Sequence, residues 1–449
     1  MTHTIHTIRI GAGAGYSGDR IPPALELAEH GQLDYLVFEC LAERTIALAQ
    51  LEKSRNPQLG FDPLLRARMQ AVLPACVRQG ITVITNMGAA NPMAAGHAIA
   101  SVAQQLELPS LKIAVIEGDD VLDCLHDPQL RLLENGAHLD TLKDRIISAN
   151  AYLGAEPIVQ ALAQGAQIIV TGRVADPSLF LAPLIHEFGW STSDWDRLGK
   201  GIMLGHLLEC AGQVTGGYFA DPGYRDVPNL ARLGFPLAEV DATGHAVITK
   251  VDCSGGAVTV HTCTAQLLYE VDNPGRYIQP DVVADFSAAQ FDEIAPNRVR
   301  ITGARGSPRP SELKVTIGYH DGYIGEGQIS YAGPGALARG RLALDVVKAR
   351  LEAQGLTGSE IRYDLIGYNA ILGESLSAGH EPYEVRVRVA VRADQRSVAE
   401  SVTNEVEALY LNGPSGGGGA TKSVREVVAA ASTLLPRDRV STRITLLET

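Results

Sequence analysis

Short apolar runs alternate with helix-like stretches in the first half of the chain. Compact apolar runs predict buried strands at residues 34–40, 81–85, 111–116 and 167–170. Apolar positions with helical spacing predict helices at residues 64–78, 157–164, 178–188 and about 195–210. This alternation predicts a mainly parallel sheet covered by helices on both faces, which is an α/β fold.

The pattern changes after about residue 246. Alternating β-branched residues predict strands at residues 246–251, 257–263, 298–302, 313–319 and 385–391. Helical spacing is confined there to residues 339–354 and 398–411. We therefore predict two domains, an α/β domain over residues 1–245 and a β-richer α+β domain over residues 246–449.

Composition and charge narrow the class of protein. The 449 residues carry a formal net charge of −13, and the basic residues are scattered, which argues against a nucleic-acid partner. No stretch approaches the roughly 20 apolar residues of a membrane span, and residues 1–5 lack the basic and apolar regions expected of a leader peptide. The six cysteines are dispersed and predict reduced thiols. A cytoplasmic protein is expected.

A glycine-rich segment follows the strand predicted at residues 6–10. Its spacing matches the dinucleotide-binding pattern GxGxxG, with Glu39 about twenty residues further on. Pro22 and Pro23 argue against that reading, because they delay the helix whose first amides should face a pyrophosphate. Two alternatives remain: a tight turn, or a loop that holds a carboxylate or thioester oxygen. The residues concerned are Gly13, Gly15, Ser17, Gly18, Asp19 and Arg20.

Polar residues follow several of the predicted strands. In an open parallel sheet, ligands bind beyond the carboxyl ends of the strands, so these residues are expected to share one crevice. Asp19 and Glu39 are candidates for catalysis there, and the candidates for binding a substrate are Arg44, Asn86, Asn91, Thr171 and Gly172.

Four more residues are candidates for catalysis. Arg173 follows a buried strand and can hold a carboxylate through two hydrogen bonds. Asp176 acts either at the site or as the N-cap of the next helix. His206 and Glu209 lie three residues apart on one helix face, as a proton-transfer pair, two metal ligands or an ordinary structural pair.

Glu39 is preferred over Cys40 as a reacting group. Burial at a strand end would raise the pKa of the Glu39 carboxyl toward neutrality, as a general acid or base requires. No histidine that could activate Cys40 is identifiable, and a buried thiol is ordinary at such a position. Near the C-terminus, Gly416, Gly417 and Lys422 indicate an anion-binding loop, a lid or a flexible connection.

Six separated segments together resemble the acyclic terpene utilisation (AtuA-like) family of bacterial cytoplasmic proteins. They are residues 9–20 (RIGAGAGYSGDR), 34–45 (DYLVFECLAERT), 169–176 (IVTGRVAD), 206–217 (HLLECAGQVTGG), 257–270 (AVTVHTCTAQLLYE) and 411–419 (LNGPSGGGG). The resemblance implies a role in the catabolism of carboxylic acids or acyl-CoA, and it supplies no mechanism. Longer family members carry a small additional C-terminal domain, so this chain looks like the short form. A small companion subunit and a homo- or hetero-oligomer are therefore expected.

These observations lead to one predicted function and two alternatives. We predict a lyase or hydratase subunit acting on a carboxylic acid or an acyl-CoA thioester. No metal and no tightly bound cofactor are expected, and CoA is allowed as part of the substrate. The alternatives are a non-catalytic scaffold or regulatory subunit of a catabolic complex, and an NAD-dependent oxidoreductase.

Overall fold

The computed structural model describes residues 6–127, 129–356 and 360–449. Residues 1–5, where no leader peptide is predicted, lie outside this range. The chain forms two compact units, which are described separately below. The first comprises residues up to 318 together with 430–449, and the second comprises residues 319–429.

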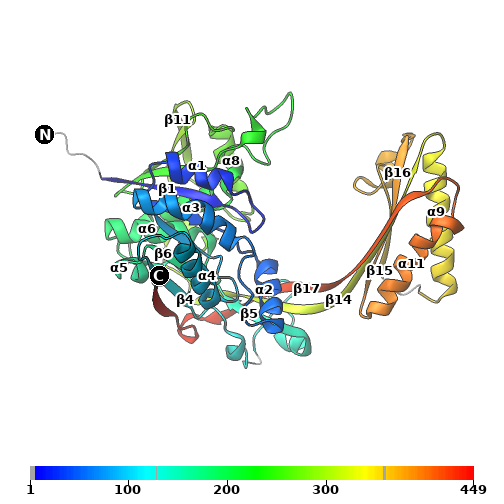
Figure 1. The fold of residues 1–449 in the computed structure, drawn as a ribbon, viewed down its shortest axis with the longest axis horizontal. Coiled ribbons are helices and arrows are strands. Elements are labelled where there is room, and N and C mark those ends of the chain that lie inside the picture. The colour runs from blue at the N-terminus through cyan, green and yellow to red at the C-terminus, as the bar shows by residue number, and fades with distance from the viewer. Residues whose placement is uncertain (1–5, 128, 357–359) are drawn as a thin grey trace. The chain divides into compact units, whose positions relative to one another are not determined.

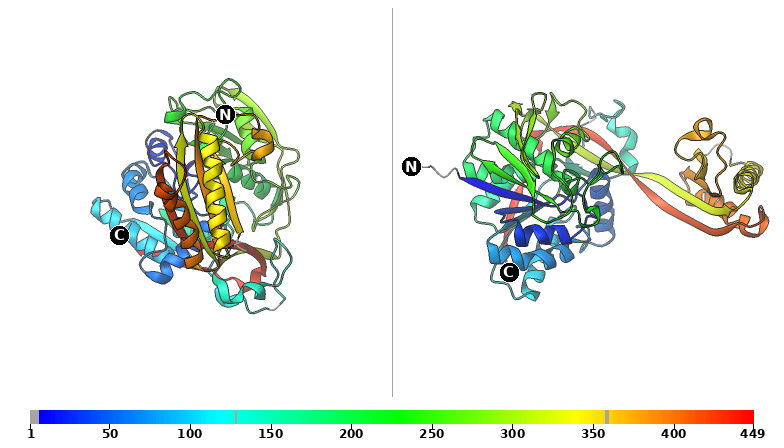
Figure 2. Two further views of the ribbon diagram at one scale, coloured as in Figure 1. Left: turned by 90° about the vertical axis from the view of Figure 1, so that its right-hand side faces the viewer. Right: turned by 90° about the horizontal axis from the view of Figure 1, so that it is seen from above.

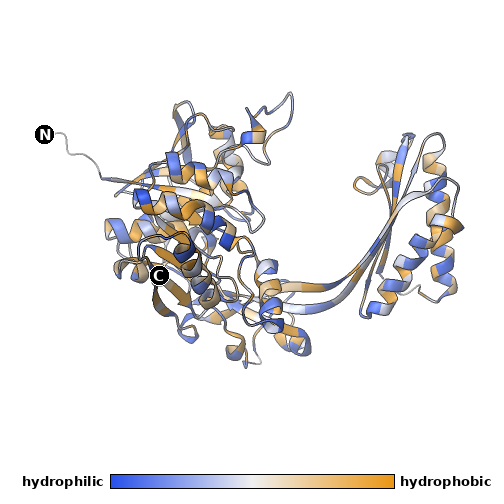
Figure 3. Ribbon diagram, viewed as in Figure 1, coloured by the Kyte–Doolittle hydropathy of each residue, from blue (hydrophilic) through white to orange (hydrophobic). Residues whose placement is uncertain are grey.

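A ten-stranded sheet forms the centre of the first unit (Figure 1). Five neighbouring strands pair in parallel, in the order β1 (Thr7–Ala14), β2 (Tyr35–Phe38), β3 (Thr82–Thr85), β6 (Ile168–Thr171) and β4 (Lys112–Glu117). Most of their residues are apolar and buried. Figure 3 colours the ribbon by the hydropathy of each residue. Strands buried on both faces need continuous apolar runs, so the predicted α/β fold is confirmed.

Helices connect and cover the parallel strands. They are α1 (Pro22–His30), α2 (Glu43–Arg55), α3 (Leu65–Gln79), α4 (Pro92–Gln105), α5 (Glu156–Ala163), α6 (Asp176–Phe188) and α7 (Trp195–Glu209). All the helices predicted in this region form within a few residues of the expected bounds. The last two pack closely against each other, so the α6 start and the α7 end both lie near the carboxyl edge of the sheet.

Antiparallel strands extend the sheet at both edges. β7 (Pro236–Asp241) pairs with β1 and is followed outward by β8 (Ala246–Lys250), β12 (Arg298–Thr302) and β11 (Gln290–Ala295). At the other edge β18 (Arg443–Glu448) pairs with β4. Segments after residue 246 therefore join the first unit, because a strand pattern does not reveal which sheet the strand will enter. The division of the chain differs accordingly from the predicted boundary at residue 245.

One predicted strand is wrong. Residues 257–263 alternate β-branched residues, but the structure forms helix α8 (Val260–Leu268) there. Thr259 and Thr262 make a capping box at its start, in which each side chain bonds the other residue's backbone N–H. Capping and burial of this helix outweigh the β propensity of its threonines and valines.

The first unit also contains short strands outside the ten-stranded sheet. β5 (Ile146–Ala151) pairs with the beginning of β14 (Glu312–Ala332). β13 (Arg305–Ser307), β10 (Val283–Asp285) and β9 (Tyr277–Ile278) form a separate three-stranded sheet. No helix among the described residues is both long and apolar enough to cross a membrane.

The second unit has the element order β-α-β-β-α-β. Its elements are β14, α9 (Ala336–Ala353), β15 (Glu360–Ile366), β16 (Glu384–Ala393), α11 (Arg396–Asn412) and β17 (Gly418–Pro436), with short α10 (Gly373–Ser377) between β15 and β16. The strands lie in the order β15-β16-β14-β17, and the two long helices lie side by side on one face (Figure 2). This is the split β-α-β arrangement of ferredoxin-like domains. The strand at residues 385–391 and both predicted helices are confirmed.

Candidate functional site

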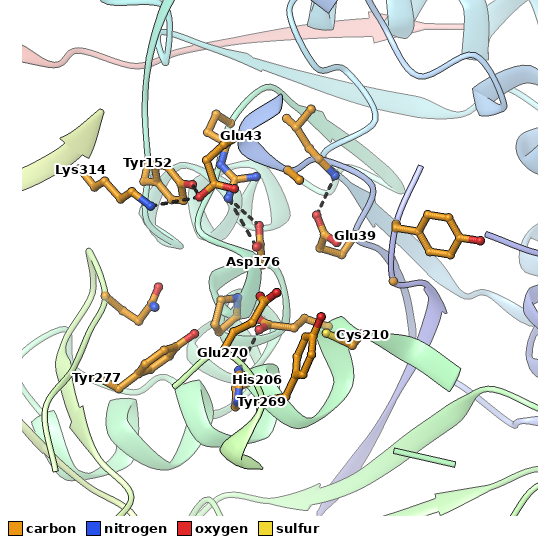
Figure 4. Close-up of a pocket in the computed structure, with 18 of the residues that line it drawn as sticks. Glu39, Glu43, Tyr152, Asp176, His206, Cys210, Tyr269, Glu270, Tyr277 and Lys314 are labelled. Atoms are coloured by element: carbon orange, nitrogen blue, oxygen red, sulfur yellow. Dashed lines mark hydrogen bonds and ion pairs between the residues drawn. The ribbon is translucent and has the colours of Figure 1, made fainter. Parts of the chain in front are cut away.

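A pocket of about 960 Å³ opens at the carboxyl ends of the parallel strands in the first unit (Figure 4). Segments after β1, β2 and β6 line it, together with the end of α7 and the beginning of β14. The pocket brings together eight of the predicted residues: Gly15, Asp19, Arg20, Glu39, Arg173, Asp176, His206 and Glu209. The shared crevice expected from strand order is therefore present.

In the glycine segment that follows β1, backbone N–H groups donate to the side chain of Asp19, a residue of the same segment. Asp19 accepts hydrogen bonds from the backbone N–H of Gly15, at 3.0 Å, and of Arg20, at 2.7 Å. A Cβ on Gly15 would lie 2.5 Å from the backbone carbon of Cys210, so this glycine lets β1 approach the end of α7. Gly13 is pressed in the same way against the Phe38 ring. The amide of Gly15 thus already has an anionic acceptor, which weakens the dinucleotide reading.

Arg68 holds this segment in place and was not found from the sequence. The side chain is fully buried, and its Nη2 donates to the backbone carbonyls of Tyr16, Ser17 and Asp19 at 2.9–3.3 Å. Its Nη1 lies 3.1 Å from Asp62. One arginine on α3 therefore fixes the loop that carries Asp19.

Glu39 follows β2 and is buried at the base of the pocket. Its Oε1 accepts hydrogen bonds from the Leu41 N–H at 2.7 Å and from Asn86 Nδ2 at 3.0 Å. Burial raises the pKa of Glu39 to about 7, although these hydrogen bonds and the charge of Arg173 oppose the rise. Glu39 is therefore a carboxyl group that exchanges a proton near neutral pH.

Arg173 and Asp176 form an ion pair after β6. Arg173 Nη2 lies 3.1 Å from Asp176, and the Arg173 guanidinium stacks 4.0 Å above the centre of the Tyr152 ring. The interpretation of Asp176 as an N-cap is wrong, because α6 begins at Asp176 itself and its N-cap, Ala175, has no capping side chain. Burial raises the pKa of Asp176, and the charge of Arg173 opposes the rise. Because the Asp176 side chain is 30% exposed and lies 3.1 Å from the guanidinium, the two groups form an ionised pair.

Glu43, Tyr152 and Lys314 form a second charged group on one side of the pocket (Figure 4). Glu43 accepts hydrogen bonds from the Tyr152 hydroxyl and from Lys314 Nζ, the latter at 3.0 Å. Burial opposes ionisation of Glu43, but Arg173, Tyr152 and Lys314 outweigh it and lower its pKa to about 2. Tyr152 and Lys314 carry no sequence signal, because only the fold brings them beside Arg173.

His206 is fully engaged by the protein. Its Nδ1 lies 2.8 Å from Glu209 Oε1, and its Nε2 lies 3.2 Å from the Leu267 carbonyl oxygen. Burial lowers the pKa of His206, but the charge of Glu209 and both hydrogen bonds outweigh this effect and raise it. Both ring nitrogens face acceptors, so the geometry favours a protonated imidazolium. The other oxygen of Glu209, Oε2, has no hydrogen-bond partner in the part of the chain that the structure describes.

Several predicted residues do not line the pocket. Asn86 supports Glu39, and Asn91 is the N-cap of α4, accepting from the Ala94 N–H. Lys422 belongs to the second unit, where it pairs with Glu407. The others outside the pocket lining are Gly13, Ser17, Gly18, Arg44, Thr171, Gly172, and, in the second unit, Gly416 and Gly417.

Two nitrogen atoms of Arg173 stand out chemically. Its Nε and Nη1 are buried and have no hydrogen-bond acceptor among the residues that the structure describes. Buried donors in folded proteins are nearly always paired, so unpaired donors beside a pocket indicate a place for a ligand oxygen or water. Within the part of the chain that the structure describes, no cluster of three or more His, Cys, Asp or Glu side chains is arranged to hold a metal ion.

Comparison with known proteins gives a family. A search of curated proteins finds no match. Among solved structures, the de novo designed protein Ferredog-Diesel matches 23% of this chain and 85% of its own, at 21% identity and a TM-score of 0.16. The family model described as "Acyclic terpene utilisation family protein AtuA" matches residues 8–446. The chain therefore belongs to the acyclic terpene utilisation family AtuA.

Proposed function

We propose that this protein transfers protons on an acyl substrate, as a hydro-lyase or hydratase acting on a carboxylic acid or an acyl thioester. One arrangement carries the proposal: Glu39, with a pKa of about 7, lines the same pocket as the unpaired N–H groups of Arg173. An acid or base works best when its pKa is close to the working pH. Fixed donors in a site poor in water stabilise an oxygen that becomes negative.

Glu39, Arg173 and Glu209 each have a separate role in the proposed reaction. In the dehydration direction, the Glu39 carboxylate takes a proton from the carbon next to the acyl carbonyl. The electron pair of that C–H bond moves toward the carbonyl oxygen, and the N–H groups of Arg173 stabilise the resulting enolate. The enolate then forms the C=C bond as the bond to the β-hydroxyl breaks. The His206–Glu209 pair gives one proton to the departing oxygen through Glu209, which leaves a neutral His206 beside the Glu209 carboxylate, and water departs. Hydration is the reverse.

The walls of the pocket suit an acyl chain. Apolar side chains line it beside the charged groups, namely Leu41, Leu233, Phe235, Leu313 and Leu434. A pocket with apolar walls and a few converging polar groups is the usual form of a small-molecule site. Terpene utilisation, the role that gives the family its name, involves branched apolar chains of this kind.

Steady-state kinetics test the proposal. We would follow interconversion of 2-enoyl and 3-hydroxyacyl compounds, as free acids and as thioesters, with the wild-type protein and Glu39→Gln. The variant is expected to lose at least about 100-fold in turnover, the usual contribution of a general base. The wild-type dehydration rate should rise with pH through about 7, because Glu39 must be ionised to accept a proton.

Glu52→Gln is the matched control, because Glu52 is exposed on α2 and does not line the pocket. It should leave turnover unchanged. Running the assay with and without a co-purified small protein also tests the proposed companion subunit. If no acyl compound is turned over under either condition, or if Glu39→Gln is as active as wild type, the proposal fails.

A further inference from the structure

The cations nearest the reacting end of the pocket are already paired with carboxylates. Arg173 pairs with Asp176 at 3.1 Å, and His206 pairs with Glu209 at 2.8 Å. Both pairs have i,i+3 spacing. A third cation, Lys314, lies 3.0 Å from Glu43. Each buried or half-buried positive charge is thus offset by a carboxylate that the protein itself supplies.

Glu39 adds a fourth carboxyl group, which forms no ion pair with any cation within the described ranges of the chain. It accepts hydrogen bonds from neutral donors, the Leu41 amide and the Asn86 side chain. Two further arginines line the pocket, Arg20 and Arg276, but both are exposed, and the exposed Glu270 and Glu312 line it too. The pocket therefore has no surplus of positive charge with which to hold an anion.

The unpaired donors of Arg173 suit a different kind of ligand group. Its Nε and Nη1 need an acceptor oxygen, whereas its charge is already offset by Asp176. A neutral carbonyl oxygen satisfies the donors without adding a negative charge beside Glu39, Asp176 and Glu209. An ionised carboxylate would add that charge next to buried acidic groups, where repulsion is stronger than in bulk water.

We propose that the pocket takes its substrate as a neutral ester or thioester and discriminates against the ionised free acid. This inference rests on the proposed function and narrows it, because that function allows both forms. Asp176 is the residue that enforces the choice, by neutralising the guanidinium that would otherwise bind a carboxylate in two-pronged fashion.

Calorimetric binding at pH 8 tests the inference with saturated probes, which cannot be hydrated. The probes are octanoate, its neutral N-acetylcysteamine thioester and octanoyl-CoA. Wild-type protein should bind both thioesters at least about tenfold more tightly than octanoate. A difference between the two thioesters would show whether the carrier contributes to binding.

Asp176→Asn gives the sharper result, because it frees Arg173 without removing any cation. Octanoate should then bind at least about tenfold more tightly, whereas the neutral thioester should change by less than about threefold. Asp194→Asn is the matched control: it alters an i,i+3 pair with Arg197 that lies outside the pocket, and asparagine still caps α7. It should change neither affinity.

Three results would overturn the inference: octanoate binding to wild-type protein as tightly as the thioesters, no probe binding, or Asp176→Asn weakening both probes equally. The binding measurement needs no turnover, so it can succeed when the proposed reaction fails. A protein that preferred thioesters but never turned over an enoyl compound would refute the reaction alone. Turnover of free acids as efficiently as thioesters would refute this inference and leave the reaction standing.

Discussion

Replacing Glu39 by glutamine should stabilise the protein at alkaline pH while it removes activity. The Glu39 carboxyl is buried and must lose its proton inside the protein when the pH rises, which is unfavourable. Glutamine keeps an oxygen that can accept from the Leu41 N–H and from Asn86 Nδ2, and it never ionises. A gain in stability with a loss of function is the signature of a group held in an unfavourable state for catalysis.

The size of the effect follows from the two pKa values. The Glu39 pKa is about 7 in the folded protein against 4.5 for an unperturbed group, a difference of about 2.5. At 1.36 kcal/mol for each pKa unit, this amounts to at most about 3 kcal/mol. Between pH 4.5 and 7 the folded state keeps a proton that the unfolded chain has lost, so the free energy of unfolding falls as pH rises. Below pH 4.5 both states are protonated, and this contribution vanishes.

Urea unfolding followed by tryptophan fluorescence measures the difference. Trp190 and Trp195, the two tryptophans of the chain, both belong to the first unit, so the signal reports on the unit that contains Glu39. Wild type and Glu39→Gln should unfold with similar free energies near pH 4, and the variant should be about 3 kcal/mol more stable at pH 8. Equal or lower stability of the variant at pH 8 would refute the reasoning.

Three further substitutions test residues that hold the groups of the site in position. Arg68→Met should lower the free energy of unfolding, measured by thermal unfolding, by about 3–5 kcal/mol, because it leaves the buried Asp62 carboxylate without its partner. A decrease below about 1 kcal/mol would count against that role of Arg68. Gly15→Ala should lower the free energy of unfolding by about 1–3 kcal/mol, because the new Cβ would clash with the Cys210 backbone. The control is Gly418→Ala, whose Cβ would meet open space. Equal decreases in the two variants would exclude the clash. His206→Gln removes the cation beside Glu209, so the pKa of Glu209 should rise further, and the pH–rate profile should show its second inflection at higher pH than in wild type. An unmoved inflection would separate this pair from the reaction.

The sequence predicts the half of the site that lies on parallel strands. Glu39 and Arg173 each follow a compact apolar run, and the carboxyl ends of parallel strands meet at one edge. Their proximity therefore follows from local patterns and one general rule of topology. The glycine spacing after β1 was less informative, because the same glycines serve close packing against Phe38 and Cys210.

The other half depends on contacts that no local pattern encodes. Tyr152 contacts Arg173 although it lies 21 residues earlier in the sequence, and Lys314 contacts Tyr152 although it lies 162 residues later than Tyr152. Arg68 reads as one more polar position on a helix, yet it is completely buried. The strands after residue 246 show why the sequence does not predict the domain boundary either. Their alternation predicts extended backbone, whereas their partner sheet is decided by long-range packing.

Exchange of hydrogen with solvent tests the central claim most directly. In D₂O, the wild-type protein should exchange the hydrogen on the carbon next to the carbonyl of an octanoyl thioester, as followed by proton NMR, and the rate should rise with pH through about 7. Glu39→Gln should slow this exchange at least about 100-fold, and Glu52→Gln should not change it. Exchange that is absent in wild type, or equally fast in Glu39→Gln, would contradict proton transfer by Glu39.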